Sequence, residues 1–162
     1  MKPSRKSKVE QRHYNMSRIH SKDTAPEILL RKALWKEGIR YRKNYKMLPG
    51  TPDIAITKNR IAIFCDGEFW HGKDWSEKKK RIQKNREYWI PKIERNIKRD
   101  IDVQNQLRYL GWYVIRFWGN DIKKDVALCV NEIKEAMIYA EWENLITLRI
   151  RLQKFSFGGG VL

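Results

Sequence analysis

The spacing of apolar residues predicts a β-hairpin near the middle of the chain. Two short apolar runs, 54–56 and 61–64, flank a polar turn at 57–60. Runs of this length that are rich in β-branched residues are typical of buried strands. The turn signal Pro49-Gly50 precedes the first run, so we predict that the hairpin starts shortly after it.

A helix is predicted between Thr24 and Gly38. Asp23 or Thr24 can cap its first turn, Pro26 suits that turn, and Gly38 is a typical residue just past a helix end. The next segment, 39–47, alternates bulky and basic residues and predicts a strand with one cationic face. The apolar residues that we expect on the buried face of the helix are Ile28, Leu29, Ala33 and Leu34.

Two more helices and one strand are predicted toward the C-terminus. The first helix has Pro91 in its first turn and ends at Gly111. A β-rich run at 112–118 predicts a central strand, and Asp121 can cap a final helix from 122 to about 142. The expected apolar stripe of the first of these helices is Ile93, Ile97, Ile101, Leu107 and Leu110. That of the final helix is Val126, Val130, Ile133 and Met137.

This order of elements predicts an α/β fold in which a mixed central β-sheet is flanked by helices. We divide the chain into a basic N-terminal arm (1–22), a folded domain (23–142) and a C-terminal tail (143–162) that we expect to be loose. The arm lacks a periodic apolar stripe, so it either orders against an acidic partner or stays solvated.

Charge and composition point to nucleic acid as the partner. The 162-residue chain has a formal net charge of +16, and 41% of its residues are hydrophobic. This balance is typical of a folded protein that binds a polyanion. A membrane surface is the competing partner, but no apolar run approaches the roughly 18 residues of a spanning helix. Two cysteines and no signal-peptide pattern lead us to expect a cytoplasmic protein without a membrane partner.

The predicted hairpin brings two carboxylates, Asp53 and Asp66, to neighbouring strand ends. Carboxylates on rigid strands suit Mg²⁺ in phosphate chemistry. His71 lies beside acidic residues at the same strand end, where it is either a proton carrier or a surface histidine. Glu27 is either the capping acid of the first helix or a further carboxylate that approaches the site.

Aromatic and apolar side chains accompany the basic surface. Phe69 and Trp70 are adjacent, so on extended backbone they point to opposite faces and one of them lies outside the core. Such a pair either stacks on bases or anchors a loop. In the arm, Met16 and Ile19 either dock on the domain or wedge into a nucleic-acid groove.

Five ordered blocks of the sequence resemble the very short patch repair (Vsr) DNA mismatch endonuclease family, a branch of the PD-(D/E)xK nuclease superfold. The resemblance extends from about Met16 to about Glu141. It implies a restriction-endonuclease-like core of three layers and a metal-dependent DNA endonuclease. The blocks are TAPE (24–27), PGTPD (49–53), DGEFWHG (66–72), EYWIPKIERNIKRD (87–100) and LGWYVIRFW (110–118).

The resemblance implies a role for each candidate catalytic residue. Asp53 and the backbone carbonyl of Cys65 match ligands of the catalytic Mg²⁺. His71 matches the residue that activates the attacking water, and Asp100 matches the carboxylate that orients it. Glu27 matches a helix carboxylate in the outer shell of the metal.

The resemblance also implies DNA contacts and a reaction. Phe69, Trp70 and Trp89 match aromatic residues that intercalate beside the mismatch, and Met16 with Ile19 matches an apolar wedge in the minor groove. The implied reaction nicks double-stranded DNA next to a T·G mismatch and leaves a 5′-phosphate. The implied protein is a monomer that acts on the bacterial nucleoid, with DNA repair proteins and a paired cytosine methyltransferase as candidate partners.

The chain departs from the family pattern at two places. Asp66 stands where the best-known members carry a histidine, and we expect it to add a direct metal ligand. Those members also hold a structural zinc, but the matching residues here are not a zinc-binding set. We therefore expect no structural zinc. The matching residues are Glu68, Lys73, Trp75 and Asn120.

Two other functions stay open at this point. One is a restriction or homing-type endonuclease of the same fold that acts on matched DNA. The other is a DNA-binding module without catalysis. Comparing the cleavage of T·G and T·A duplexes separates the first from mismatch repair, and Mg²⁺-dependent nicking separates the second.

Overall fold

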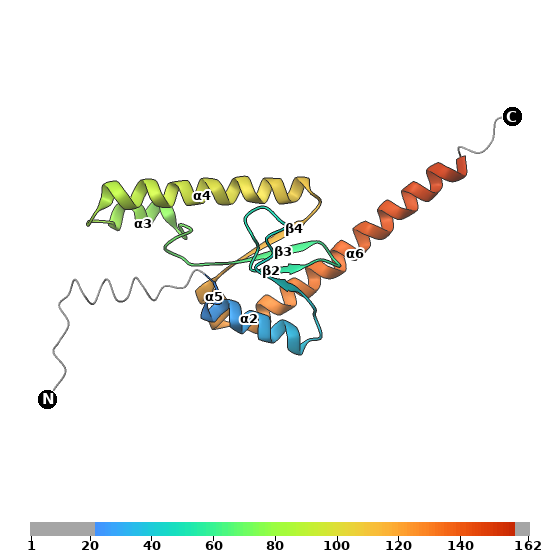
Figure 1. Ribbon diagram of the computed structural model, residues 1–162, viewed down its shortest axis with the longest axis horizontal. Coiled ribbons are helices and arrows are strands. Elements are labelled where there is room, and N and C mark those ends of the chain that lie inside the picture. The colour runs from blue at the N-terminus through green and yellow to red at the C-terminus, as the bar shows by residue number, and fades with distance from the viewer. Residues whose placement is uncertain (1–21, 158–162) are drawn as a thin grey trace.

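The computed structural model consists of a four-stranded sheet between two layers of helices (Figure 1). It describes the backbone of residues 22–157 and the side chains of residues 22–147. The predicted α/β class, with a mixed sheet flanked by helices, is confirmed. Helix α4 (Arg86–Tyr109) lies on one face with α3 (Trp75–Arg81) beside it, and the other face carries α2 (Ala25–Lys36), α5 (Gly119–Lys124) and α6 (Val126–Phe157).

The sheet has the order β1-β2-β3-β4. The predicted hairpin is confirmed as β2 (Ile54–Ile56) and β3 (Ile61–Asp66), which pair antiparallel. Strand β4 (Tyr113–Trp118) pairs parallel to β3. Parallel neighbours need a crossover connection, and α4 supplies it by running back along the sheet.

Two strand predictions are wrong in part. The segment 39–47 contributes only β1 (Arg42–Lys43), because Asn44 has a positive φ of 46° and bends the chain. The run 112–118 forms a strand as predicted, but β4 lies at the edge of the described sheet instead of its centre. The chain leaves β4 directly into α5 and α6, so the described part of the chain offers no strand for its outer side.

The buried face of α2 also differs from the prediction. Thr24 caps the helix as one of the two predicted residues, but Ile28 and Leu29 are 39% and 37% exposed. Two charged residues, Glu27 and Arg31, are buried in their place. Leu34 is buried as predicted, but the hydrophobic pattern missed the rest of this face because a charged pair is buried there beside Leu30.

Helix α4 begins earlier than predicted, at Arg86, so Pro91 lies inside the helix and not in its first turn. Ile101 and Leu110 of the predicted stripe are 55% and 50% exposed, because at helical spacing they lie on either flank of the buried face that Ile93 marks. Ile93 and Leu107 are fully buried as expected. The charge-dense segment before α4 forms the separate helix α3, which the sequence pattern did not predict.

The final helix is divided by Asp125 and extends further than predicted. The Leu128 N–H donates to Asp125 Oδ1 at 2.9 Å, so Asp125 and not Asp121 caps α6. Val130 and Ile133 are buried as expected. The prediction that the chain is loose after residue 142 is wrong up to Phe157, since α6 continues to that residue and projects from the body (Figure 1).

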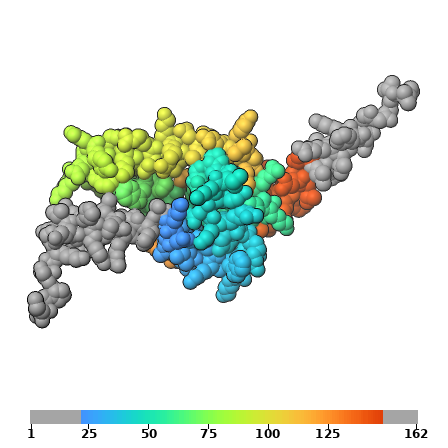
Figure 2. Space-filling model, viewed as in Figure 1, coloured from blue at the N-terminus to red at the C-terminus, as the bar shows by residue number. Residues whose placement is uncertain are grey.

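Strand β3 separates two apolar clusters and positions the site. Ile61 and Ile63 pack into the larger cluster under α2 and α6, whereas Ala62 and Phe64 pack with Leu107 of α4. Because side chains alternate along a strand, Asp66 lies on the same face as Phe64, the face that α4 covers. Figure 2 shows α4 as a ridge along one side of the molecule.

Gly72 fixes the loop after β3 against α4. Its φ is +68°, and a Cβ there would lie 2.5 Å from Ile97 Cδ1. We predict that Gly72→Ala lowers the free energy of unfolding by about 2–4 kcal/mol, because the backbone strain and the overlap with Ile97 add. Denaturant unfolding of the two proteins measures this difference.

Gly38→Ala is the matched control for this substitution. Gly38 has a φ of +76°, and no neighbouring atom lies within 4 Å of the place that an alanine Cβ would take. Gly38→Ala should therefore lower the free energy of unfolding by only the cost of backbone strain, about 1–2 kcal/mol. Equal losses for the two variants would show that the loop does not depend on its contact with α4.

Candidate active site

The start of β2 and the end of β3 meet at one edge of the sheet. Ile54 pairs with Ile63 in the antiparallel register, so Asp53 lies beside the end of β3. The backbone N–H of Cys65 donates to Asp53 Oδ2 at 2.7 Å. The hairpin thus brings Asp53, Cys65 and Asp66 to one place, as the sequence indicated.

His71 and Asp100 meet at the same edge from different elements. Asp100 Oδ2 lies 2.6 Å from His71 Nδ1, and Asp66 Oδ1 lies 3.6 Å from the same nitrogen. Burial lowers the pKa of His71, but the hydrogen bond to Asp100 and the charge of Asp66 outweigh it, so the pKa is raised above its usual value. Conversely, burial raises the pKa of Asp100, and His71 and Arg116 lower it further than burial raises it.

Arg116 is a functional candidate that the sequence pattern did not reveal. Its Nε lies 2.6 Å from Asp66 Oδ2 and its Nη2 lies 2.9 Å from Asp66 Oδ1. The same Nη2 lies 3.2 Å from Asp100 Oδ1. The available signal was an arginine inside the apolar run 113–118, between the inward-facing Ile115 and Phe117.

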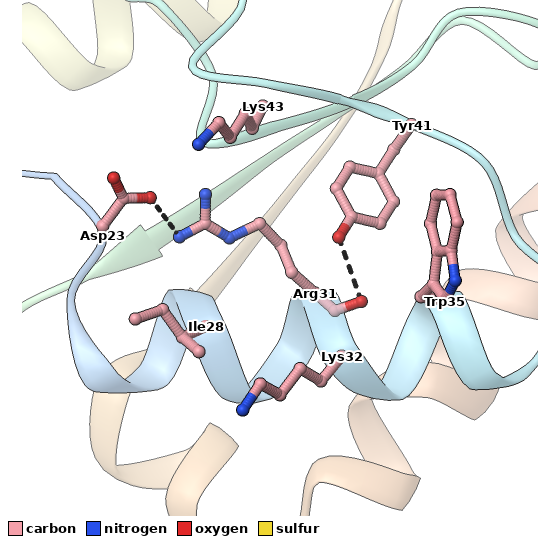
Figure 3. Close-up of a pocket in the computed structure, with 7 residues that line it drawn as sticks. All are labelled: Asp23, Ile28, Arg31, Lys32, Trp35, Tyr41 and Lys43. Carbon is pink, nitrogen blue, oxygen red and sulfur yellow. Dashed lines mark hydrogen bonds and ion pairs between the residues drawn. The ribbon is translucent and has the colours of Figure 1, made fainter.

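Glu27 lies at the N-terminus of α2 and fulfils the capping role. It accepts hydrogen bonds from the Thr24 hydroxyl at 2.6 Å and from the Asp23 backbone N–H at 3.0 Å. Arg31 Nη2 lies 3.7 Å from Glu27 Oε2, the oxygen that accepts from the Asp23 N–H, and Figure 3 shows that the same guanidinium also pairs with the Asp23 side chain. The charge of Glu27 reaches Asp53 and raises the pKa of that carboxyl.

Asp53 differs from the other carboxylates at this edge because no cationic side chain of the described residues pairs with it. Burial raises its pKa from 3.8 to about 6, and the charges of Glu27 and Asp66 add to this effect. An under-compensated carboxylate is suited to a hard divalent cation, which prefers oxygen ligands. Asp53 therefore fits a metal ligand, whereas both oxygens of Asp66 already contact Arg116. Within residues 22–147, no cluster of three or more His, Cys, Asp or Glu side chains is preformed around a metal position.

The three predicted intercalating residues form one aromatic cluster. The ring centroid of Phe69 lies 5.2 Å from that of Trp70 and 5.4 Å from that of Trp89. Phe69 is 45% exposed, and Lys92 Nζ lies 5.4 Å from the Trp70 ring. The predicted wedge residues Met16 and Ile19 lie outside the described residues, as does nearly all of the predicted arm.

Polar contacts tie the loop after β3 to the start of α5. The Asn120 backbone N–H donates to Glu68 Oε1 at 2.7 Å, and Lys73 pairs with Asp121 at 3.0 Å. Trp75 is half-buried and donates to Glu94 at 3.4 Å. The four positions that the resemblance compares with zinc ligands thus take part in polar contacts within and around this loop.

A groove of about 400 Å³ lies between α2 and β1 (Figure 3). Trp35 and Tyr41 form one end of it, and Tyr41 donates its hydroxyl hydrogen to the Arg31 carbonyl at 3.1 Å. Lys32 and Lys43 are exposed beside it. Because Arg31 is paired with Asp23, these two lysines are the cationic side chains of the groove that form no ion pair within the described residues.

Comparisons with known proteins decide the family. The family model described as "DNA mismatch endonuclease Vsr" matches residues 5–77. The type II nicking enzyme V.NmeDIP of Neisseria meningitidis serogroup C is 49% identical over 128 residues, which are 79% of this chain and 86% of the relative. V.HpaIIP, a type II nicking enzyme of Haemophilus parainfluenzae, is 49% identical over 117 residues, 72% of this chain and 83% of that protein.

The chain belongs to the Vsr family. A further relative, the DNA mismatch endonuclease Vsr of Escherichia coli strain K12, is 36% identical over 107 residues, 66% of this chain and 68% of the relative. This Vsr-family protein is therefore a DNA endonuclease. Among the helices that the structure describes, none combines the length and the apolar character needed to cross a membrane.

The raised pKa of Asp53 predicts a pH-dependent cost of keeping it ionised. Its folded-state pKa of about 6 exceeds the ordinary value of 3.8, so the folded protein binds the proton more tightly than the unfolded chain does. Tighter proton binding at Asp53 stabilises the folded protein. This stabilisation is fully present below about pH 4 and is lost as the pH rises through 6. Asp53→Asn, which stays neutral, should therefore be more stable than the wild type at pH 7.5, by up to about 3 kcal/mol.

Denaturant unfolding at pH 4 and pH 7.5 in the presence of EDTA tests this. The advantage of Asp53→Asn should be small at pH 4 and should appear at pH 7.5. The control is Asp102→Asn on the exposed side of α4, which should show no such pH dependence. A variant that is equally stable or less stable than the wild type at pH 7.5 would contradict the assigned environment of Asp53.

Proposed function

We propose that this protein is a Mg²⁺-dependent endonuclease that nicks one strand of double-stranded DNA next to a T·G mismatch and leaves a 5′-phosphate. The observation that carries the proposal is the Asp53 carboxylate, which pairs with no cation of the described residues and lies at the same sheet edge as the His71–Asp100 pair. The names of the relatives, which are nicking enzymes and a mismatch endonuclease, support the reaction and the substrate.

Metal dependence is general in this nuclease family, and the chain offers ligands for it. We assign the metal to Asp53 and to the backbone carbonyl of Cys65. A bound Mg²⁺ supplies positive charge that stabilises the reacting phosphate and favours hydroxide formation. The sequence also favours Asp66 as a metal ligand, but its pairing with Arg116 gives it a different role. The expectation that the protein holds no structural zinc is part of the proposal.

His71 takes the proton of the attacking water in this proposal. The 2.6 Å contact assigns its Nδ1–H as a donor to Asp100, which leaves Nε2 as the proton acceptor. When the imidazole becomes charged, Asp100 and Asp66 stabilise it. General-base catalysis of this kind contributes about 10²–10⁴-fold to the rate.

DNA binding combines charge with aromatic insertion. The net charge of +16 and the lysines of the α2–β1 groove supply contacts to phosphates, which give affinity without sequence preference. Phe69, Trp70 and Trp89 enter the base stack, where a mispaired base separates at lower cost than a matched one. The proposal includes a monomer in the bacterial cytoplasm, with repair proteins and a cytosine methyltransferase as candidate partners.

Nicking of a panel of duplexes tests the proposed function. Duplexes that carry each mismatch, and matched T·A and C·G controls, are incubated with the full-length protein and Mg²⁺, and the product ends are determined. We expect a single nick with a 5′-phosphate, fastest at T·G. Equal cleavage of matched duplexes would instead show a restriction-type enzyme.

Asp53→Asn should abolish nicking and keep duplex binding, because it removes a metal ligand but no positive charge. Asp102→Asn, on the exposed side of the same molecule, is the control and should cleave like the wild type. Nicking by Asp53→Asn at the wild-type rate would remove Asp53 from the metal site. If the wild type binds DNA but nicks none of the duplexes, the protein would instead be a DNA-binding module without catalysis.

Trp70→Ala should reduce the preference for mismatched over matched duplex more than it reduces general affinity. Loss of one base–aromatic contact costs about 1–3 kcal/mol, and only the mismatched complex makes it. Trp142→Ala, which removes a 63% exposed tryptophan from α6, is the control. Binding titrations with both duplexes measure the ratio, and an unchanged ratio for Trp70→Ala would exclude insertion by this side chain.

A further inference from the structure

Arg116 is a charged group at the active site that the proposed reaction does not use. It is paired in register with Phe64 of β3, and its guanidinium carbon lies 4.7 Å from the centroid of the Phe64 ring. Only 20% of its side chain is exposed. A charge in such a position is stable only with close partners of opposite charge, so its contacts indicate what it does.

Arg116 closes a ring of four side chains, which we call the Arg116 ring. The guanidinium donates two hydrogen bonds to Asp66, at 2.6 and 2.9 Å, and its Nη2 lies 3.2 Å from Asp100. His71 Nδ1 lies 2.6 Å from Asp100 and 3.6 Å from Asp66 on the opposite side. Each carboxylate therefore contacts both the guanidinium and the imidazole.

We propose that Arg116 is a positioning residue that, together with Asp66, fixes Asp100 and thereby the orientation of the His71 imidazole. Two carboxylates that face one imidazole repel each other, and a guanidinium between them removes this repulsion. The planar fork of arginine also sets the spacing of its partners, which a point charge does not. Asp66 then acts on Arg116 and His71 and is not a metal ligand. This inference rests on the proposed function, in which His71 accepts the proton.

The contacts argue against a direct role of Arg116 in DNA binding. Its Nε and Nη2 are occupied by carboxylates, and its Nη1 is buried without an acceptor among the described residues. A DNA phosphate at Nε or Nη2 would therefore compete with Asp66 and Asp100. Arg99 also lies near Asp100 but does not hold it, because its Nη2 is 4.0 Å from Asp100 Oδ1 and its side chain is 62% exposed.

The test compares Arg116→Gln, Asp66→Asn and the double variant with the wild type. The readouts are the single-turnover nicking rate at saturating protein, the Kd for the duplex and the Mg²⁺ concentration that gives the half-maximal rate. Each single variant should nick about 10–100-fold more slowly, with the Kd and the Mg²⁺ requirement unchanged. The double variant should be no slower than the singles, since both substitutions break the same pair. The matched control, Arg99→Gln, should nick at the wild-type rate.

A spectroscopic readout separates positioning from a loss of folding. In metal-free, ¹⁵N-labelled protein, the His71 Nδ1–H resonance should be present in the wild type and in Arg99→Gln and lost in Arg116→Gln. Arg116→Lys keeps the positive charge but lacks the planar guanidinium, and it replaces Arg116→Gln in the test if that variant does not fold. It should nick more slowly than the wild type, with a weakened His71 Nδ1–H signal.

Several results would overturn the inference. One is wild-type nicking by Arg116→Gln, or by Arg116→Lys if only that variant folds. Another is an increased Mg²⁺ requirement of Asp66→Asn, which would make Asp66 a metal ligand. A raised Kd for Arg116→Gln would make Arg116 a DNA contact. A wild-type protein that nicks no duplex would instead refute the proposed function, and the imidazole resonance would still decide whether the ring orients His71.

Discussion

Buried carboxylates need partners of opposite charge or hydrogen-bond donors, and this constraint organises the sheet edge where the candidate active site lies. Glu27, Asp53, Asp66 and Asp100 all lie there, and within residues 22–147 two largely buried arginines, Arg31 and Arg116, pair with them. Arg31 forms an ion pair with Glu27, while Arg116 forms ion pairs with both Asp66 and Asp100. Asp53 receives one backbone N–H and, among the described residues, no cationic side chain. The charge that it lacks is the charge that a divalent cation brings.

The topology of the sheet explains why these groups meet. The tight hairpin of β2 and β3 places Asp53 next to the end of β3, and the parallel pairing of β3 with β4 places Arg116 on the same face as Asp66. The crossover helix α4 carries Asp100 over that face. Gly72 lets the loop after β3 approach α4 closely enough for His71 to reach Asp100. The site is thus assembled from the hairpin, the loop that follows it, the crossover helix and the parallel strand.

The sequence predicts the parts of this arrangement that depend on local patterns. Two β-branched runs around a polar turn are sufficient to predict the hairpin and hence the approach of Asp53 to Cys65. The resemblance pointed to Asp100 beside His71, and the structure shows the two in contact. The same local reasoning predicts the apolar face of α6, because Val130 and Ile133 recur at helical spacing.

The sequence fails where burial contradicts polarity. Glu27 and Arg31 lie on the buried face of α2, where a hydrophobic pattern selects Ile28 and Leu29 instead. The sequence does not reveal the role of Arg116 for the same reason, since an arginine within a strand is expected to face water unless its partners are known. Those partners are 16 and 50 residues away in the chain, at Asp100 and Asp66. Only the assembled sheet shows that they share one guanidinium.

A crystal structure of the protein with a T·G duplex, and with Ca²⁺ in place of Mg²⁺ to slow the reaction, tests the central claim most directly. The account predicts a cation bound to an Asp53 oxygen, Asp66 still held by Arg116, and the free nitrogen of His71 directed at a water molecule beside the scissile phosphate. A cation bound by Asp66 after displacement of Arg116, or one remote from Asp53, would contradict it.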